Sequence, residues 1–391
     1  MPFAAALSRA DDTRRACAEA CDAAMATLPR PELALIFFSP HHVPGIADEI
    51  KDLRERLGVK ALVGCVGEAI VGVGQEIELE PAVSLWLGSW NGRMEIEAFH
   101  LAPSRTPDGW SLLGWPDSLL EVNASQTTML LLGDPYTFPA DQLFLPRVND
   151  DHAGLRVIGG NASGSVGPRQ TTLIINDRPE SLGAVAVLLS GPAKIRSVVS
   201  QGCRPIGRPL VITRGQETLI EQLGGKSPLD QLRELWPELS PADQDLVRRG
   251  LHLGVVINEY QEKFERGDFL VRNIYGIDSN TGSMAVMDHI RVGQTVQFHV
   301  RDSDSADEDL RRLLETDRER NASPPAGALL FTCNGRGTRL FSQPHHDALA
   351  VQQVSGGIPL AGFFAAGEYG PVGGKNFIHG FTASLAVFED S

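Results

Sequence analysis

The sequence has 391 residues, 42% of them hydrophobic and 21% charged, which is typical of a folded chain with more than one core. Its formal net charge of −14 argues against a sequence-independent grip on nucleic acid or on an anionic membrane, because both need clustered Lys and Arg. Its apolar runs are shorter than the roughly 20 residues that span a bilayer. We therefore expect no nucleic-acid partner and no membrane partner.

The N-terminal segment and the cysteines indicate a cytoplasmic protein. Charged residues between Arg9 and Arg15 stand where a secretion signal needs an apolar stretch. The five cysteines are odd in number and include no C-x-x-C pair, which favours a reducing compartment. Cys17 and Cys21 lie one helical turn apart, but they lack matching His or carboxylate partners for a metal. We interpret them as buried small residues.

The predicted elements begin with a helix over residues 8–28, with Ser8 as its N-cap and Pro29 as its stop. One pattern then occurs three times: an apolar strand, a helix, a strand running into a glycine-rich stretch, and a second apolar strand. The three copies cover residues 33–87, 128–189 and 328–388. A strand–helix–strand crossover makes its strands parallel, so that their carboxyl ends meet at one sheet edge. The alternative is that glycine-rich hairpins are ordinary turn chemistry and the repeat is coincidental.

The ends of these strands carry polar residues and glycines. The first strands close at Ser39-Pro40, Asp134-Pro135 and Asn334-Gly335. The glycine-rich stretches open at residues 64–67, 159–164 and 362–367. Ligands of parallel sheets bind outside the carboxyl ends of the strands. We therefore predict one concavity surrounded by four polar side chains, those of Asp134, Asn161, Asn334 and Glu368.

The region between the second and third copies has a different pattern. Apolar alternation over 269–274, 283–287 and 295–300 predicts antiparallel hairpin strands. A charged helix is expected from Ser305 to about Arg320. The predicted class is mixed α/β, with two halves of mixed parallel and antiparallel sheets flanked by helices. We expect an N-terminal helix in 1–30 and domains over 31–197 and 198–391, because the boundary falls near residues 194–200.

Two long motifs near the C-terminus are GALLFTCNGRGTRLF and PLAGFFAAGEYGPVGGKNFIHGFTASLAVF, both between Gly327 and Phe388. This segment resembles the FIST C-terminal domain in the order of its residues Cys333, Asn334, Gly335, Arg336, Gly337, Gly367, Glu368, Gly370, His379 and Thr382. SQGCRPIGRPLVITRG, which contains Cys203, looks like the entry to that domain, and GDFLVRNI is similar to its middle. LGDPYTFP, RVIGGNASG and GAVAVLLSG resemble the FIST N-terminal domain.

The resemblance covers nearly the whole chain after Pro31. It implies a sensory module of intracellular, bacterial signal transduction that binds a small molecule, such as an amino acid or a related carboxylate metabolite. No kinase, cyclase or receptor segment is visible in the sequence. Any signalling output is therefore expected to come from a partner protein.

The candidate ligand-binding residues stand in or beside the glycine-rich turns, where function is more common than within strands. They are Asp134, Gly160, Asn161, Cys203, Cys333, Asn334, Arg336, Glu368 and His379. Arg336 lies between two glycines and should be free at its tip to hold a ligand carboxylate in a bidentate pair. The alternative for Arg336 is an ion pair with Glu368.

An enzyme is the alternative function, because Cys333, His379 and Glu368 are residue types of an activated thiol nucleophile. A buried thiol and a hydrogen-bonded core histidine explain the same residues without catalysis. A third hypothesis is a scaffold that binds protein through its sheet surface. The glycine-rich segments do not match nucleotide-binding motifs. Ile220 stands where a P-loop requires glycine, and Leu340 stands where a dinucleotide-binding fingerprint requires it. We expect a binding protein with no cofactor and no metal.

Overall fold

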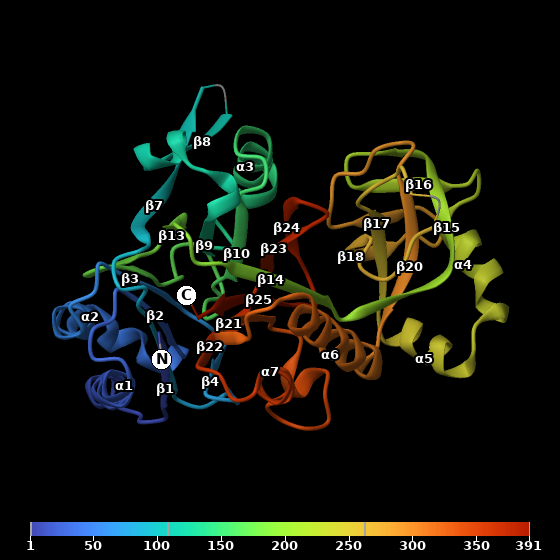
Figure 1. The fold of residues 1–391 in the computed structure, drawn as a ribbon. Helices are drawn as coiled ribbons and strands as arrows, with labels where there is room; N and C mark the ends of the chain where they lie inside the picture. Colours follow the sequence, from blue (N-terminus) through green and yellow to red (C-terminus); the bar gives the residue numbers. More distant parts are fainter. Residues whose placement is uncertain (1, 108, 262, 391) are drawn as a thin grey trace. The chain divides into compact units, whose positions relative to one another are not determined.

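The computed structural model describes residues 2–107, 109–261 and 263–390, which form two compact units. The core unit contains the chain up to Val199 and again from Leu310 onward. The inserted unit contains Ser200–Asp309. Helices and strands of both pairing directions occur throughout, so the predicted mixed α/β class is confirmed (Figure 1).

The core unit consists of three modules with the same order of elements. Module 1 has β2 (Leu33–Phe38), α2 (Val43–Leu57), β3 (Ala61–Val66), β4 (Ala69–Gly72), β5 (Gln75–Glu78) and β6 (Val83–Gly88). Module 2 has β9 (Thr127–Gly133), a π-helical turn (Ala140–Phe144), α3 (Leu145–Asp151), β10 (Arg156–Asn161), β11 (Leu173–Ile175), β12 (Arg178–Glu180) and β13 (Ala184–Ser190). Module 3 has β21 (Pro325–Cys333), α7 (His346–Ser355), β22 (Leu360–Ala365), β23 (Glu368–Val372), β24 (Lys375–His379) and β25 (Thr382–Glu389). The threefold repeat predicted from the sequence is confirmed.

Each module lends its hairpin to the sheet of another module. The hairpin β11–β12 of module 2 pairs with β3 of module 1, and β23–β24 of module 3 pairs with β10 of module 2. The hairpin β4–β5 of module 1 pairs with β22 of module 3, which closes the ring. Each sheet is completed by an edge strand: β1 (Phe3–Ser8), β7 (Glu95–Thr106) with β8 (Gly109–Leu113), or β14 (Ile195–Gln201). No module can therefore complete its sheet alone.

The parallel pairs β2–β3, β9–β10 and β21–β22 share one close backbone contact. Gly64, Gly159 and Gly362 occupy equivalent places on the second strands. A Cβ on any of them would lie less than 3.0 Å from a carbonyl oxygen of the first strand. Glycine is needed there because the two backbones leave no room for a side chain. These three glycines also give a common register for comparing the modules.

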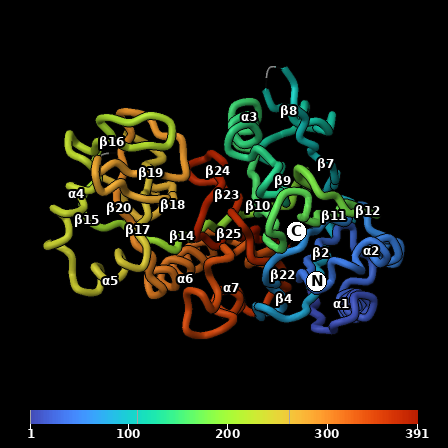
Figure 2. Tube along the Cα trace, turned by 180° about the vertical axis from the view of Figure 1, so that it is seen from behind, coloured from blue at the N-terminus to red at the C-terminus, as the bar shows by residue number. Residues whose placement is uncertain are grey.

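The largest core lies between the three sheets and draws residues from all three modules. Its aromatic centre joins Phe37, Phe331 and Phe363, whose ring centroids are 5.3–6.4 Å apart. The outer faces of the sheets are covered by helices: α1 (Thr13–Thr27) and α2 on the first, α3 on the second, and α7 with α6 (Ser303–Arg320) on the third (Figure 2). The modules thus share one interior core and have separate outer cores.

The N-terminal segment differs from its prediction. Ser8 ends strand β1 and does not cap a helix, because the preceding apolar residues pair with β6 along their full length. Helix α1 begins at Thr13, and its N-cap is Asp12, whose carboxylate accepts from the Arg15 N–H at 2.8 Å. Tertiary pairing therefore takes the first residues of the expected helix into a sheet.

The inserted unit is a closed barrel with the strand order β15-β16-β19-β18-β17-β20. Its strands are β15 (Cys203–Gln216), β16 (Leu219–Leu223), β17 (Leu251–Val256), β18 (Phe269–Ile277), β19 (Met284–Val286) and β20 (Thr295–Arg301), with helices α4 (Pro228–Leu235) and α5 (Pro241–Arg249). The predicted hairpin pairing of β18 with β19 is confirmed, but the third predicted strand, β20, pairs with β17 and β15 and not with β19. The chain leaves the core unit near the expected boundary but returns to it after Asp309, so the compact units do not follow the halves 31–197 and 198–391.

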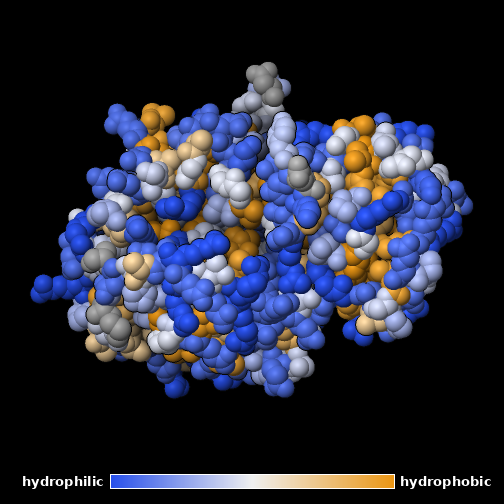
Figure 3. All heavy atoms as spheres, turned by 45° about the vertical axis from the view of Figure 1, so that its right-hand side comes forward, coloured by the Kyte–Doolittle hydropathy of each residue, from blue (hydrophilic) through white to orange (hydrophobic). Residues whose placement is uncertain are grey.

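The surface view in Figure 3 shows mostly hydrophilic residues, with apolar residues in smaller patches. Among the described parts of the chain, no helix combines the length and the apolar character needed to cross a membrane. The large apolar side chains are instead concentrated in the five cores of the two units.

Candidate functional site

The ends of the parallel strands in modules 2 and 3 meet within the core unit, as the sequence predicts. The Asn161 N–H donates to the Gly367 carbonyl at 2.8 Å, and the Ala366 N–H donates to the Asn161 carbonyl at 2.9 Å. The Asn334 N–H donates to the Ala365 carbonyl at 2.9 Å. The predicted concavity shared by four side chains is wrong, however, because Asp134 and Glu368 are both 0% exposed. The space between the strand ends is largely filled by the protein's own side chains.

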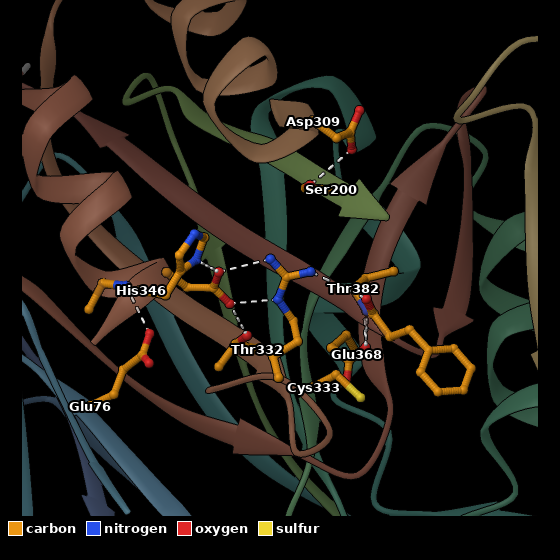
Figure 4. A network of polar contacts seen from close by, with 12 residues as sticks. Glu76, Ser200, Asp309, Thr332, Cys333, His346, Glu368 and Thr382 are labelled. Atoms are coloured by element: carbon orange, nitrogen blue, oxygen red, sulfur yellow. Dashed lines mark hydrogen bonds and ion pairs between the residues drawn. The ribbon is translucent and has the colours of Figure 1, made fainter. Parts of the chain in front are cut away.

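In module 3 the strand ends are filled by an ion pair. The fully buried Arg336 donates from Nε to Asp347 Oδ2 at 2.6 Å and from Nη2 to Oδ1 at 2.8 Å. Asp347 also accepts from the Thr332 hydroxyl at 2.6 Å, and its Oδ1 lies 3.0 Å from Nδ1 of His346 (Figure 4). Burial disfavours the charged form of both residues, but the opposite charge and the hydrogen bonds of the partner outweigh this effect. The pKa of Arg336 is therefore raised, and that of Asp347 is held below its usual range. The pair is ionised and well hydrogen-bonded.

This arrangement corrects the expectation for Arg336. Its guanidinium is not free at the tip, and its carboxylate partner is Asp347 at the start of α7, not Glu368. The Phe341 ring covers the guanidinium at 5.2 Å and stacks on His346. A residue so enclosed belongs to the packed interior of module 3, and a ligand carboxylate has no access to it in this conformation.

Two further buried carboxyl groups lie in this network. Glu368 Oε2 accepts from the Thr382 hydroxyl at 2.7 Å and from its N–H at 3.2 Å, while Oε1 has no hydrogen-bond partner among the described residues. Glu76, which module 1 contributes through β5, accepts from the Ala348 N–H at 2.9 Å. Burial raises the pKa of each to about 8, and for Glu76 the charge of Asp347 adds to the effect. Both carboxyl groups therefore stay protonated to a pH well above the ordinary pKa of glutamate, which is 4.5.

The remaining predicted residues of module 3 are also sheltered. Cys333 ends β21 with its side chain buried, and its Sγ lies 3.8 Å from Oδ1 of Asn334. His379 is buried on β24, and its Nε2 lies 3.0 Å from the Gly370 carbonyl. His379 also stands opposite Glu368 in the hairpin register. The hydrogen bond to Gly370 agrees with a core histidine.

The corresponding strand ends of module 2 are open. A pocket of about 490 Å³ lies where β9 and β10 end, beneath the segment 135–142. Its lining also includes Pro103, Trp110, Asn161, Arg169, Leu182 and Ile378. All of these residues belong to the core unit. Of the nine predicted site residues, Asn161 is the one in this lining.

Both polar atoms of the Asn161 side chain are hydrogen-bonded at the pocket. Its Oδ1 accepts from the Tyr369 hydroxyl, and its Nδ2 donates to the Ala366 carbonyl at 3.4 Å. Asp134 is hydrogen-bonded to residues next to the pocket: its carboxylate accepts from the hydroxyls of Thr137 and Thr171, the latter at 2.6 Å. Asp134 is therefore an anchor for the loop over the pocket, and its buried side chain is not in the pocket lining.

The exposed part of the pocket combines aromatic surface with one cation. Trp110 is 52% and Tyr136 44% exposed, which leaves ring surface available to a ligand. Arg169 is exposed, has a left-handed backbone with φ 64°, and forms no ion pair with any described residue. None of these three residues is among the candidates predicted from the sequence. Tyr136 lies within the motif LGDPYTFP, but Trp110 and Arg169 carry no local signal.

Gly160 and Cys203 have no place in this pocket. Gly160 pairs with Glu368 across β10 and β23, and a Cβ there would lie 2.7 Å from Cβ of Ala365, so its role is close packing. Cys203 begins β15 in the inserted unit and is buried. Within the described ranges, no cluster of three or more His, Cys, Asp or Glu side chains could hold a metal ion.

The fold and the pocket define a mixed α/β protein of interlocked modules with an open crevice at the strand ends. Residues 32–226 match the FIST N domain and residues 228–371 match the FIST C domain. The chain belongs to the FIST family, whose domains are sensory domains of signal transduction.

The chain is similar to mycobacterial proteins along its whole length. It is 42% identical over 392 residues to the "Uncharacterized protein Rv0628c" of Mycobacterium tuberculosis, with both chains covered completely. It is 43% identical over 381 residues to the "Uncharacterized protein Mb0898c" of Mycobacterium bovis, which covers 97% of this chain and 96% of that protein. The similarity therefore extends over both the core unit and the inserted unit.

Proposed function

We propose that the protein is a small-ligand sensor whose pocket beside Asn161 binds an amino acid or a related carboxylate metabolite. The observation that carries this proposal is the open pocket at the ends of β9 and β10, with Arg169 as its one basic lining residue in the described structure. Its volume of about 490 Å³ lies in the range of small-molecule sites. Its position is also that at which parallel sheets bind ligands.

The lining supplies groups for each part of such a ligand. Arg169 offers a planar pair of N–H donors, which suits a carboxylate. Gln142 and Asn161 add amide groups, and Asp141 adds a carboxylate to the lining, which would favour an ammonium group. The rings of Trp110 and Tyr136 provide apolar surface for the remainder of the ligand.

A bound ligand would contact more than one module. The pocket includes Ile378 of the hairpin β23–β24, which module 3 lends to the sheet of module 2. The hydroxyl of Tyr369 on the same hairpin is bonded to Asn161. Ligand contacts with the loop 135–142 and with this hairpin would therefore bias the packing between two modules. We infer that a partner protein reads this change.

The test is a thermal-shift screen of the full chain with amino acids, their deaminated carboxylic acids and the matching amines, followed by calorimetry on the hits. We expect carboxylate-bearing compounds to raise the melting temperature. Arg169→Ala should weaken their binding roughly 10- to 150-fold, the equivalent of about 1.5–3 kcal/mol for a hydrogen bond to a charged group.

The matched control is Arg249→Ala, which removes an exposed arginine from the end of α5 in the inserted unit. It should leave both affinity and melting temperature unchanged. If carboxylates bind equally well to the Arg169→Ala protein, or if none of them binds, the proposed site is wrong. Binding by the acids and not by the amines would support the role given to Arg169.

A further inference from the structure

A second hollow lies at the opposite end of strand β10, where the parallel strands begin. It measures about 590 Å³ and belongs wholly to the core unit. Three basic residues line it, Arg156, Lys194 and Arg196, and its described lining contains no acidic residue. Ser125, Ser197 and Asn321 add polar groups. In a chain with a formal net charge of −14, such a concentration of positive charge requires an explanation.

Arg156 has no counterion in this hollow. It is half-buried, and the one hydrogen bond of its side chain among the described residues runs from Nε to the Thr128 hydroxyl at 3.4 Å. Burial lowers its pKa, and no neighbouring carboxylate offsets that effect. Arg196, on the same hollow, is by contrast neutralised by Asp317 at 2.9 Å and Glu389 at 2.6 Å. A sheltered guanidinium without a carboxylate is costly unless an anion from solution occupies the space beside it.

The fold itself does not require an arginine at this position. Gly64, Gly159 and Gly362 align the modules, and Arg156 stands three residues before its glycine. The residues at the same place in modules 1 and 3 are Ala61 and Pro359. The positive charge is therefore particular to module 2 and serves something other than strand pairing.

Two further groups that line the hollow have no acceptor or counterion among the described residues. The Ser197 hydroxyl is buried and has no hydrogen-bond partner in the described structure. Lys194 is exposed and forms no ion pair with a described residue. A buried hydroxyl normally finds a partner, so an unpartnered one in a hollow lined by two cations without counterions indicates a missing acceptor.

We propose that this hollow, defined by Arg156, Lys194 and Ser197, is a binding site for a small phosphate-bearing anion. A phosphate group offers several acceptor oxygens and more than one negative charge, which matches a guanidinium, an ammonium and a hydroxyl. The volume exceeds what a bare phosphate needs, so an organic phosphate fits better than the inorganic ion. The site is separate from the pocket beside Asn161 and does not depend on the function proposed for it.

The experiment is calorimetric titration of the full chain with inorganic phosphate, pyrophosphate and a nucleoside monophosphate, with sodium chloride and sodium sulfate at equal ionic strength as references. We expect saturable binding of at least one phosphate, and tighter binding of the organic phosphate than of the inorganic ion. Arg156→Gln should weaken that binding at least tenfold, and Lys194→Ala several-fold. The control Arg249→Ala, at an exposed arginine that lines neither pocket, should not change it.

Melting temperatures of the same variants separate binding from a structural role. Without phosphate, Arg156→Gln should melt at the same temperature as the wild type or higher, because it removes an uncompensated charge, and phosphate should no longer raise its melting temperature. A lower melting temperature of Arg156→Gln without phosphate would overturn the proposal. Failure of all three phosphates to bind saturably, or equal binding to wild type and Arg156→Gln, would also overturn it.

Discussion

The strand ends of modules 2 and 3 occupy equivalent places in the ring of sheets and are filled in opposite ways. In module 3, Arg336 and Asp347 close the space with a buried ion pair. In module 2, the carboxylate of Asp134 turns inward to Thr137 and Thr171, and the loop that follows arches over an open pocket. The backbone topology thus creates equivalent crevices, and the side chains decide which of them can accept a ligand.

The difference also separates stability from recognition. A buried, fully bonded ion pair is sensitive to the loss of either partner, because the other charge remains without compensation. Arg169 in the open pocket is exposed, so its removal should affect binding and leave folding nearly unchanged. This division of roles implies large losses of stability for variants of the closed module and small ones for variants of the open pocket.

The largest effect is expected from Asp347→Ala. It leaves Arg336 buried without its carboxylate, which should cost about 3–5 kcal/mol of unfolding free energy. Arg336→Ala should be similarly destabilising, because Asp347 then stays buried and uncompensated. Urea denaturation of the full chain measures both changes.

Asp245→Ala is the matched control, since Asp245 forms an exposed ion pair with Arg248 and should contribute no more than about 1 kcal/mol. A loss for Asp347→Ala as small as that of the control would contradict the closed state of module 3. The double variant Arg336→Met/Asp347→Leu should recover much of the stability lost in Asp347→Ala, because no isolated charge remains.

A smaller effect is expected from the buried Glu368 as the pH changes. The pKa of its carboxyl group is about 8 in the fold and ordinarily 4.5, so between these values the folded state holds a proton that the unfolded state has released. Its contribution to stability is therefore fully present below about pH 4.5 and is lost as the pH rises through about 8. Glu368→Gln keeps the neutral form and should lose less stability than the wild type between pH 6 and pH 9, by on the order of 2 kcal/mol.

Denaturation curves at several pH values check this prediction. The control is Glu315→Gln on α6, whose side chain is exposed and which should follow the wild type. Parallel pH profiles for wild type and Glu368→Gln would show that the carboxyl group is ionised in the fold.

The smallest effect on binding is expected from Cys333→Ser. Cys333 is buried in the closed module and is not in the pocket lining, so carboxylate affinity should change less than about twofold. Calorimetry with a ligand from the thermal-shift screen measures the affinity. A turnover of that ligand that disappears in Cys333→Ser, with unchanged folding, would instead support the enzyme alternative, which requires a thiolate.

The repeat of modules could be predicted from the sequence because it depends on local patterns. The three apolar runs predicted as first strands, of which Leu33–Phe38 is one, form β2, β9 and β21. Gly64, Gly159 and Gly362 on the second strands allow the two backbones of each pair to approach closely. Within each module, the strand–helix–strand crossover makes the two strands parallel, so that their carboxyl ends lie at one edge of the sheet. Local chemistry thus determined the modules and the family, and it placed Asn161 among the site candidates.

Only the tertiary structure decided which module is open. The exchange of hairpins joins segments such as β4 and β22, which are far apart in the chain, and no local pattern encodes that choice. The partner of Arg336 is selected by where α7 begins, and the pocket combines Trp110, Arg169 and Ile378 from three distant segments. Burial and charge pairing depend on these long-range contacts, so a sequence read locally shows that an arginine is present but not whether it faces a carboxylate or a ligand.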